Sequence, residues 1–286
     1  MSNSPLANPS ATRAVLERHG LALKKSLGQH FLIDDNIVGR ILALAALDAQ
    51  TPVLEIGPGI GTLTAALCGA SGAVTAVERD RDLLPALEEI AASCPSLRVV
   101  EADAVTVAAA DLETAIGPPT ALVANLPYGV AATVVLRFFE ELPSLRMATV
   151  MVQAEVADRM AAAPGGKEYG AYTVKLRMIA APAGRFAVPR TCFMPPPRVD
   201  SAVLRLERVE REESQELLQA TARLAEAAFA QRRKTLRNSL ISASGLGAAR
   251  IDAALTATGT DGRRRAETLS PDEFIALATA LETLPR

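Results

Sequence analysis

The sequence has 286 residues, of which 49% are hydrophobic and 22% charged, with a formal net charge of -2. This composition excludes a disordered chain and predicts one globular domain of ordinary size plus a smaller one. No apolar run approaches the roughly 18 residues of a membrane span, and the first five residues contain no charged region leading into an apolar one, so we expect no secretory signal. The cysteines, Cys68, Cys94 and Cys192, are far apart and only two histidines are present. We therefore expect no metal site and no disulfide framework, which fits a reducing cytoplasm.

The charges are unevenly distributed along the chain. Residues 51 to 150 carry 5 Lys/Arg against 12 Asp/Glu, whereas residues 223 to 240 carry 5 against 1. A local basic patch binds phosphates whatever the total charge. The near-neutral total therefore does not exclude nucleic acid as a partner.

The first part of the chain predicts a tail and one helix. Residues 1 to 12 are rich in Ser, Asn, Pro and Ala and are expected to form a mobile tail. Residues 34 to 47 have the apolar spacing of an amphipathic helix, with Asp34 or Asp35 as its N-cap. Between them, His30 stands beside two apolar residues and is either a packed histidine or a ligand contact.

A glycine-rich turn after the first strand predicts a nucleoside site. The strand at 52 to 56 runs into Gly57-Pro-Gly-Ile-Gly61, and a helix follows. Such glycines let the main chain approach a ligand. The next strand, 73 to 77, ends at Glu78, 21 residues after Gly57, where a carboxylate accepts ribose hydroxyls. A purely structural turn is the alternative.

Two residues of this turn distinguish between nucleoside cofactors. Pro58 removes a main-chain donor that a pyrophosphate would use. Thr62 occupies the position at which the dinucleotide fingerprint, counted from Gly57, has its last glycine. A cofactor without phosphates, such as S-adenosylmethionine, requires less of this loop. The turn therefore favours a methyltransferase over an oxidoreductase.

Further strands alternate with helices, which predicts an α/β fold with a parallel, doubly wound sheet. The expected strands are residues 97 to 101, 121 to 124, 147 to 152, 174 to 179 and 201 to 206, and the expected helices are residues 80 to 92, 131 to 141 and 155 to 163. Asp103 follows the third strand and either accepts an adenine amine or caps a turn.

The loop Asn125-Leu-Pro-Tyr128 follows the fourth strand, at the edge where open α/β sheets bind ligands. It offers an uncharged amide, a main chain stiffened by proline and an aromatic face, which suit a planar amino-bearing base. An ordinary Asn-Pro turn is the alternative. Three consecutive prolines keep residues 192 to 199 extended, so Phe193 projects into a cleft or packs in the core.

Residues 209 to 286 have a helical pattern and predict a small all-α domain. Its first helix is expected to end in the basic run 231 to 240. Four cations in that run, together with residues 263 to 265, form a phosphate-binding surface or a merely solvated face. The four cations are Arg232, Arg233, Lys234 and Arg237.

Seven motifs, in this order and spacing, resemble the small-subunit ribosomal RNA adenine N6,N6-dimethyltransferases of the KsgA/RsmA type. The motifs are Leu27-Gly-Gln-His-Phe-Leu32, Leu54-Glu-Ile-Gly-Pro-Gly-Ile-Gly61, Val77-Glu-Arg-Asp80, Ala102-Asp-Ala104, Asn125-Leu-Pro-Tyr128, Phe193-Met-Pro-Pro-Pro-Arg-Val-Asp-Ser-Ala202 and Gln231-Arg-Arg-Lys-Thr-Leu-Arg-Asn-Ser-Leu240. The basic run and residues 265 to 270 separate the chain from the resistance methylases that act on large-subunit RNA.

The resemblance implies a Rossmann-like class I methyltransferase domain at residues 24 to 208, preceded by residues 1 to 23, and a helical RNA-binding domain at residues 209 to 286. It implies a cytoplasmic monomer that uses S-adenosylmethionine to dimethylate two adjacent adenosines near the 3′ end of 16S rRNA in an immature 30S subunit. The implied cofactor contacts are His30, Leu32, Gly57, Gly59, Glu78, Asp103 and Asn125. The residues implied at the target base are Asn125, Leu126, Tyr128 and Phe193.

Three positions depart from the family pattern. His30 replaces a common Asn, Gly129 a common polar residue, and Ala154 a common Lys. The glycine is expected to loosen the substrate loop, and the alanine removes an RNA cation. A nicotinamide-dependent oxidoreductase and a non-enzymatic ribosome assembly factor remain the rival functions.

Overall fold

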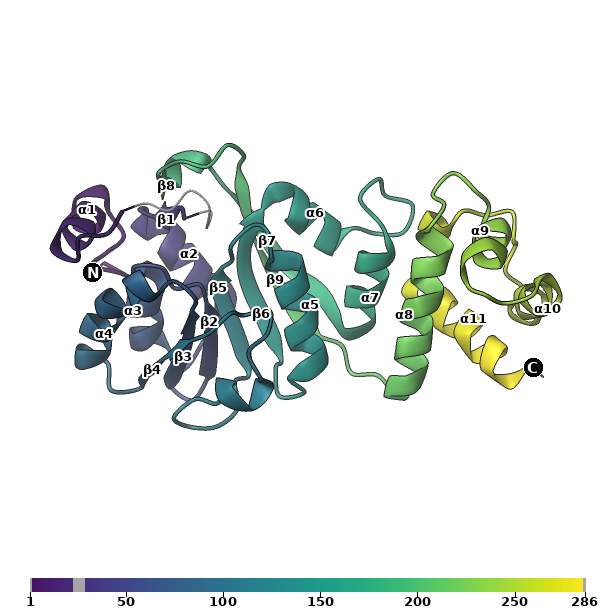
Figure 1. The fold of residues 1–286 in the computed structure, drawn as a ribbon, viewed down its shortest axis with the longest axis horizontal. Helices are drawn as coiled ribbons and strands as arrows, with labels where there is room; N and C mark the ends of the chain where they lie inside the picture. Colours follow the sequence, from purple (N-terminus) through teal and green to yellow (C-terminus); the bar gives the residue numbers. More distant parts are fainter. Residues whose placement is uncertain (1, 23–28, 285–286) are drawn as a thin grey trace. The chain divides into compact units, whose positions relative to one another are not determined.

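The computed structural model describes residues 2 to 22 and 29 to 284. The chain divides into two compact units (Figure 1). The first comprises Met1–Ala157 and Pro182–Arg208, and the second comprises Asp158–Ala181 and Val209–Arg286. The division at residue 208 coincides with the expected one, whereas residues 158 to 181 group with the helical unit. The expected boundary between residues 23 and 24, and the motif residues Leu27 and Gly28, lie outside the described residues.

The first unit is built on a seven-stranded sheet in the order β4-β3-β2-β5-β6-β9-β7. The strands are β2 (Pro52–Ile56), β3 (Ala73–Glu78), β4 (Leu97–Glu101), β5 (Ala121–Asn125), β6 (Met147–Gln153), β7 (Ala180–Val188) and β9 (Ser201–Arg208). β2 pairs in parallel with both β3 and β5, and β9 is antiparallel to β6. The strand order thus reverses beside β2, which creates the crevice where such sheets bind ligands.

Burial explains why the central strands read as continuous apolar runs. Every residue of β2 and β3 is buried, as expected for parallel strands covered on both faces. The helices of this unit are α1 (Pro9–Arg18), α2 (Asp35–Ala45), α3 (Thr62–Ala70), α4 (Leu84–Ser93), α5 (Ala131–Glu141) and the first half of α6 (Ala154–Ala161). Asp34 caps α2 by accepting the N–H groups of Asn36 and Ile37, which confirms the expected start of this helix.

One predicted strand was wrong. Residues 174 to 179 belong to α7 (Ala171–Ile179), and the strand β7 follows directly after it. Val174, Leu176 and Met178 are buried and alternate like strand residues, so periodicity alone could not separate the two structures. The hydroxyl of Thr173 accepts from the N–H of Gly170 at 3.3 Å, a local bond that favours the helix.

The expected mobile tail was also wrong. The backbone N–H groups of Asn3 and Ser4 donate to the carboxylate of Asp35 at 3.0 and 2.8 Å. Asn8 caps α1 by accepting from the N–H of Ala11 at 2.8 Å. Of these polar residues, Asn8 caps α1, and Asn3 and Ser4 bind the first turn of α2 through hydrogen bonds to Asp35.

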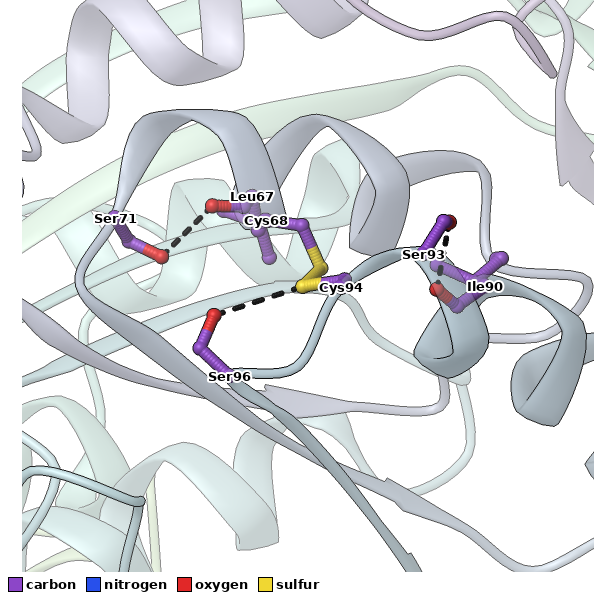
Figure 2. The surroundings of a disulfide bond; sticks show 7 residues. All are labelled: Leu67, Cys68, Ser71, Ile90, Ser93, Cys94 and Ser96. Atoms are coloured by element: carbon purple, nitrogen blue, oxygen red, sulfur yellow. Dashed lines mark hydrogen bonds between the residues drawn. A yellow bond between two sulfur atoms is a disulfide. The ribbon is translucent and has the colours of Figure 1, made fainter.

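The cysteines correct another expectation. Cys68 at the end of α3 and Cys94 just after α4 form a disulfide, although 26 residues separate them in sequence (Figure 2). The hydroxyl of Ser96 lies 3.6 Å from the sulfur of Cys94. The sequence spacing gave no sign of this pairing, because the fold places the ends of the two helices together. Cys192 is free and buried.

The second unit is helical. It contains α7, α8 (Gln215–Phe229), α9 (Leu236–Ala243), α10 (Ala248–Thr258) and α11 (Pro271–Thr283). Its core joins Tyr169 and Val174 to the apolar faces of these helices. The basic run does not end the first helix as expected: α8 stops at Phe229, and α9 begins after Thr235, whose hydroxyl accepts from the N–H of Asn238.

Within the described ranges, no helix is both long enough and apolar enough to cross a membrane. The same residues contain no group of three or more His, Cys, Asp or Glu side chains arranged to hold a metal ion.

Candidate active site

A cavity of about 440 Å³ lies at the carboxyl ends of β2, β3 and β5. This volume is in the range of small-molecule and cofactor sites. Its walls are the segment before β1 (Phe31–Leu32), the glycine turn, the ends of β3 and β4, and the Asn125-Leu-Pro-Tyr128 loop. The expected site residues that line it are His30, Leu32, Gly57, Gly59, Glu78, Asp103, Asn125, Leu126 and Tyr128.

Glu78 organises the glycine turn. Its side chain is 7% exposed and accepts three backbone N–H groups, from Gly59 at 3.1 Å, Arg79 at 2.9 Å and Asp80 at 2.8 Å. Burial raises the pKa of Glu78, and these hydrogen bonds act against that shift. A carboxylate has about four acceptor positions. Three are used by the backbone, so about one acceptor position remains for a ligand.

The segment that carries Asp103 is held from two sides. Asp103 pairs with Arg79 at 3.2 Å and accepts the N–H of Val105 at 2.9 Å. Arg137 of α5 donates to the carbonyl of Ala104 at 2.8 Å and also to the carbonyl of Val107. The loop that carries Asp103 is therefore fastened to the helix that follows the Asn125-Leu-Pro-Tyr128 loop.

His30 and Tyr128 also line the cavity. Nδ1 of His30 lies 2.7 Å from the carbonyl oxygen of Pro195, which only accepts, so Nδ1 carries the proton. The His30 and Tyr128 rings are stacked with centroids 5.9 Å apart. The Tyr128 hydroxyl lies 2.8 Å from that of Ser201, and burial raises the Tyr128 pKa.

The Asn125 amide has a defined orientation. Its Nδ2 donates to the carbonyl of His30 at 3.4 Å, so the side-chain oxygen points away from that bond. The N–H of Leu126 donates to the carbonyl of Met151 at 3.0 Å, which extends the β5–β6 ladder by one residue. Both residues line the cavity, and Oδ1 of Asn125 and the carbonyl oxygen of Leu126 are uncharged groups of the kind that accept the hydrogens of an amine.

The structure does not bring Phe193 to the cavity. Its side chain is 2% exposed, belongs to the main hydrophobic core and lies opposite Leu32 in the short β1–β8 pair, where β8 is Phe193–Met194. The core alternative is therefore the one observed. The proline segment still reaches the site through Pro195, which holds the His30 ring.

The four cations of the basic run differ in their surroundings. Arg233 and Lys234 are exposed on the turn between α8 and α9. Arg232 donates to the carbonyl of Lys167, and Arg237 pairs with Asp252 through two bonds of 2.5 and 2.7 Å. Leu236 and Leu240 are buried, as expected. Two of the four cations thus also have partners within the helical unit.

Sequence reasoning missed two residues of the site. Glu55 is 1% exposed, lines the cavity and has an oxygen without a hydrogen-bond partner among the described residues. The sequence did contain a signal for Glu55, because it is the one charged residue in the otherwise apolar strand β2. Arg137 gave no signal, because its partners are backbone carbonyls 30 and 33 residues away.

Comparisons with known proteins find relatives along nearly the whole chain. Residues 20 to 283 match the model of a family described as "Ribosomal RNA adenine dimethylase". "Ribosomal RNA small subunit methyltransferase A" of Shouchella clausii is 41% identical, with 98% of this chain and 96% of that protein covered. The protein of the same name from Myxococcus xanthus is 43% identical, with 95% of each chain covered.

Solved structures share the fold. The structure of the 23S rRNA methyltransferase ErmE has a TM-score of 0.65 and 29% identity, covering 88% of this chain and all of that one. A dimethyladenosine transferase from Plasmodium falciparum has a TM-score of 0.72 and 22% identity, covering 87% and 96%. The predicted class I, Rossmann-like methyltransferase fold and its S-adenosylmethionine chemistry are confirmed. The chain belongs to the ribosomal RNA adenine dimethylase family.

Proposed function

We propose that this chain dimethylates N6 of two adjacent adenosines in a hairpin loop near the 3′ end of 16S rRNA, within an immature 30S subunit. The observation that carries the proposal is the pair of uncharged acceptors at Asn125 and Leu126 beside the cavity. The small-subunit target is supported by the relatives of 41% and 43% identity, compared with 29% for the large-subunit enzyme ErmE.

The proposed chemistry depends on alignment. S-adenosylmethionine supplies a methyl group on a sulfonium, which is already strongly electrophilic. The N6 lone pair of adenine is delocalised into the ring and is a poor nucleophile. Asn125 Oδ1 and the Leu126 carbonyl accept the two N6 hydrogens and turn the lone pair toward the methyl group, so that positioning contributes most of the acceleration.

The target base is proposed to stack on Tyr128, a contact worth about 1–3 kcal/mol. Stacking by Phe193 as well requires its ring to leave the core, because the side chain is 2% exposed. The second methylation is compatible with neutral acceptors, since an uncharged oxygen tolerates the loss of one donor.

The cofactor contacts are proposed from the geometry of the cavity. Glu78 binds the ribose through its remaining acceptor position, and Asp103 binds the adenine amine. Gly57, Gly59, His30 and Leu32 line the remainder. The fit is supported by the glycine turn, which Glu78 holds in place and which leaves the backbone accessible to a ligand.

We also propose the functional division of the chain. Residues 24 to 208 carry the methyltransferase chemistry, and residues 209 to 286 bind RNA through Arg232, Arg233, Lys234 and Arg237. The protein acts as a monomer in the cytoplasm, the compartment in which ribosomal subunits are assembled.

The test is tritiated-methyl transfer to immature 30S subunits, with 50S subunits as the control substrate. We expect transfer to 30S alone, and Asn125→Ala should retain binding of S-adenosylmethionine while losing transfer. Near-normal transfer by Asn125→Ala would contradict the acceptor role. Binding to 30S without any transfer by the wild type would instead favour a non-enzymatic assembly factor.

A further inference from the structure

The disulfide between Cys68 and Cys94 has no part in the proposed methyl transfer, although it lies in the unit that carries the cavity. Cys68 is half-buried in the last turn of α3, and Cys94, directly after α4, is 8% exposed. Disulfides of cytoplasmic proteins are mostly transient bonds with a catalytic or redox-sensing role. The proposed cytoplasmic location therefore makes this bond a candidate for reversible chemistry.

The disulfide joins two helices that each have their own support. The hydroxyl of Ser71 donates to the carbonyl of Leu67 at 2.7 Å, and that of Ser93 donates to the carbonyl of Ile90 at 2.9 Å (Figure 2). Each helix end is thus held by a local hydrogen bond. Leu67 of α3 and Leu87 of α4 are also fully buried. We therefore expect both helices to persist when the disulfide is broken, which is a condition for a reversible bond.

The surroundings of the two sulfur atoms favour attack at Cys68. Cys68 is the more exposed of the two residues, so we expect a small thiol to reach its sulfur first. A disulfide sulfur carries no hydrogen, so the Ser96 hydroxyl at 3.6 Å is the donor toward Sγ of Cys94 (Figure 2). Attack on Cys68 releases Cys94 as a thiolate, and a nearby hydrogen-bond donor stabilises that leaving group.

The same bond closes a loop that carries part of the cavity wall. Four lining residues lie between the two cysteines in the sequence: Glu78, Arg79, Asp80 and Leu83. Gly61, the N-cap of α3, packs directly on α4, because a Cβ atom at Gly61 would overlap the side chain of Ile90. α3 is therefore fixed to α4 twice, by the glycine before its first turn and by the cysteine in its last turn.

We propose that Cys68 and Cys94 form a reversible thiol–disulfide exchange site, at which low-molecular-weight thiols and disulfides set the affinity of the cavity for its cofactor. The inference rests on the proposed function, in which that cofactor is S-adenosylmethionine. When the bond is broken, α4 is held to α3 by packing rather than by a covalent bond. The glycine turn and residues 78 to 83 then gain freedom that binding must remove, so the reduced protein binds the cofactor more weakly.

Reduction takes two exchange steps. A thiolate of the reductant attacks Sγ of Cys68, the bond to Sγ of Cys94 breaks, and the Cys94 thiolate takes up a proton. A second reductant thiolate attacks the reductant sulfur of this mixed disulfide and releases Cys68, which is protonated in turn. The two cysteines gain two electrons and two protons, and two molecules of thiol become one disulfide. Oxidation by a low-molecular-weight disulfide is the reverse reaction.

Thiol counting and cofactor binding test the two parts of the proposal. The full chain is equilibrated with glutathione disulfide or with reduced glutathione, freed of both, and its thiols are counted in denaturant with a chromogenic reagent. Because the sequence has three cysteines, one thiol per chain is expected after oxidation, that of Cys192, and three after reduction. Calorimetry should then give a Kd for S-adenosylmethionine that is at least about five-fold larger in the reduced state. Circular dichroism establishes that both states are folded.

Two variants separate this site from other effects of thiols. Cys68→Ala cannot form the bond and should bind with the weaker, reduced-state affinity in both buffers, whereas Cys192→Ala should keep the wild-type dependence. A dependence that persists in Cys68→Ala comes from another group and overturns the proposal.

Two results on the wild type overturn the proposal without any variant. They are a thiol count that is the same in both buffers and a Kd that is the same in both redox states. A wild type that binds no S-adenosylmethionine in either state refutes the proposed function, and control of cofactor affinity with it, while the thiol count still decides whether the bond exchanges.

Discussion

The ring of Pro127 occupies the space that a side chain on Gly57 would need. A Cβ atom at Gly57 would lie 3.2 Å from Cδ of Pro127, and the φ angle of Gly57 is +65°. The glycine turn after β2 and the loop after β5 thus touch through a position where only glycine fits. Two walls of the cavity are therefore in direct contact there.

Gly57→Ala should therefore weaken both folding and cofactor binding. A left-handed φ costs a non-glycine residue about 1–2 kcal/mol, to which the contact with Pro127 adds. Chemical denaturation and calorimetry with S-adenosylmethionine measure the two effects. Gly129→Ala is the matched control, because a Cβ there meets nothing within 4 Å and φ is not positive. Equal losses in both variants would refute the steric explanation.

Glu55→Gln should change how stability depends on pH. The pKa of Glu55 is raised from 4.5 to about 8 in the folded protein. Between these values the folded state holds a proton that the unfolded state has lost, so wild-type stability falls as pH rises. Glutamine removes this loss, and the variant should gain on the order of 1–4 kcal/mol relative to wild type between pH 5 and pH 8. Parallel pH dependences in urea denaturation would contradict the prediction.

Arg137→Ala should weaken cofactor binding more than methyl transfer at saturating cofactor. Arg137 donates hydrogen bonds to the carbonyls of Ala104 and Val107, so its loss frees the loop that carries Asp103. We expect KM for S-adenosylmethionine to rise roughly 10-fold. Hydrogen bonds from charged groups contribute about 1.5–3 kcal/mol each, and only part of that energy is expected to affect cofactor binding. Glu141→Ala removes only the half-exposed ion-pair partner of Arg137 and should have little effect. A fall in kcat alone would contradict the positioning role.

The basic run should separate into two groups of cations. Arg233→Ala with Lys234→Ala should weaken RNA binding and reduce its salt slope by about two units, without changing the stability of the helical unit. Arg237→Ala should also lower the thermal midpoint, because Arg237 pairs with Asp252. In a double-mutant cycle, Arg237→Ala and Asp252→Ala should be non-additive in stability. An additive result would show that the pair contributes nothing.

Most of the sheet was predictable, because local pattern and tertiary structure agree there. Apolar runs bounded by turn residues are typical of buried parallel strands, and β2, β3, β5 and β6 lie where these runs are. The glycine turn and the acid at Glu78 converge for the same reason, since they follow neighbouring parallel strands.

The remaining features depend on contacts between distant residues. The hydrogen bond from Asn3 to Asp35 and the disulfide between Cys68 and Cys94 join segments that are far apart in the sequence, and no local sequence pattern indicates either contact. The burial of Phe193 is decided by its antiparallel pairing with Leu32. Charge counting likewise could not reveal that Arg237 is already paired, because Asp252 lies on a different helix.

The discontinuity of the helical unit limits how this protein can be divided or recombined. The chain passes between the two units three times, at residues 157/158, 181/182 and 208/209. A fragment cut at residue 208 would keep Tyr169 and Val174 but lose the helices whose apolar faces bury them. Exchange of the complete helical unit between relatives therefore requires two segments to be replaced at once. A single crossover at residue 208 would instead pack residues 158 to 181 of one protein against the helices of the other, so that the two halves of one core come from different sequences.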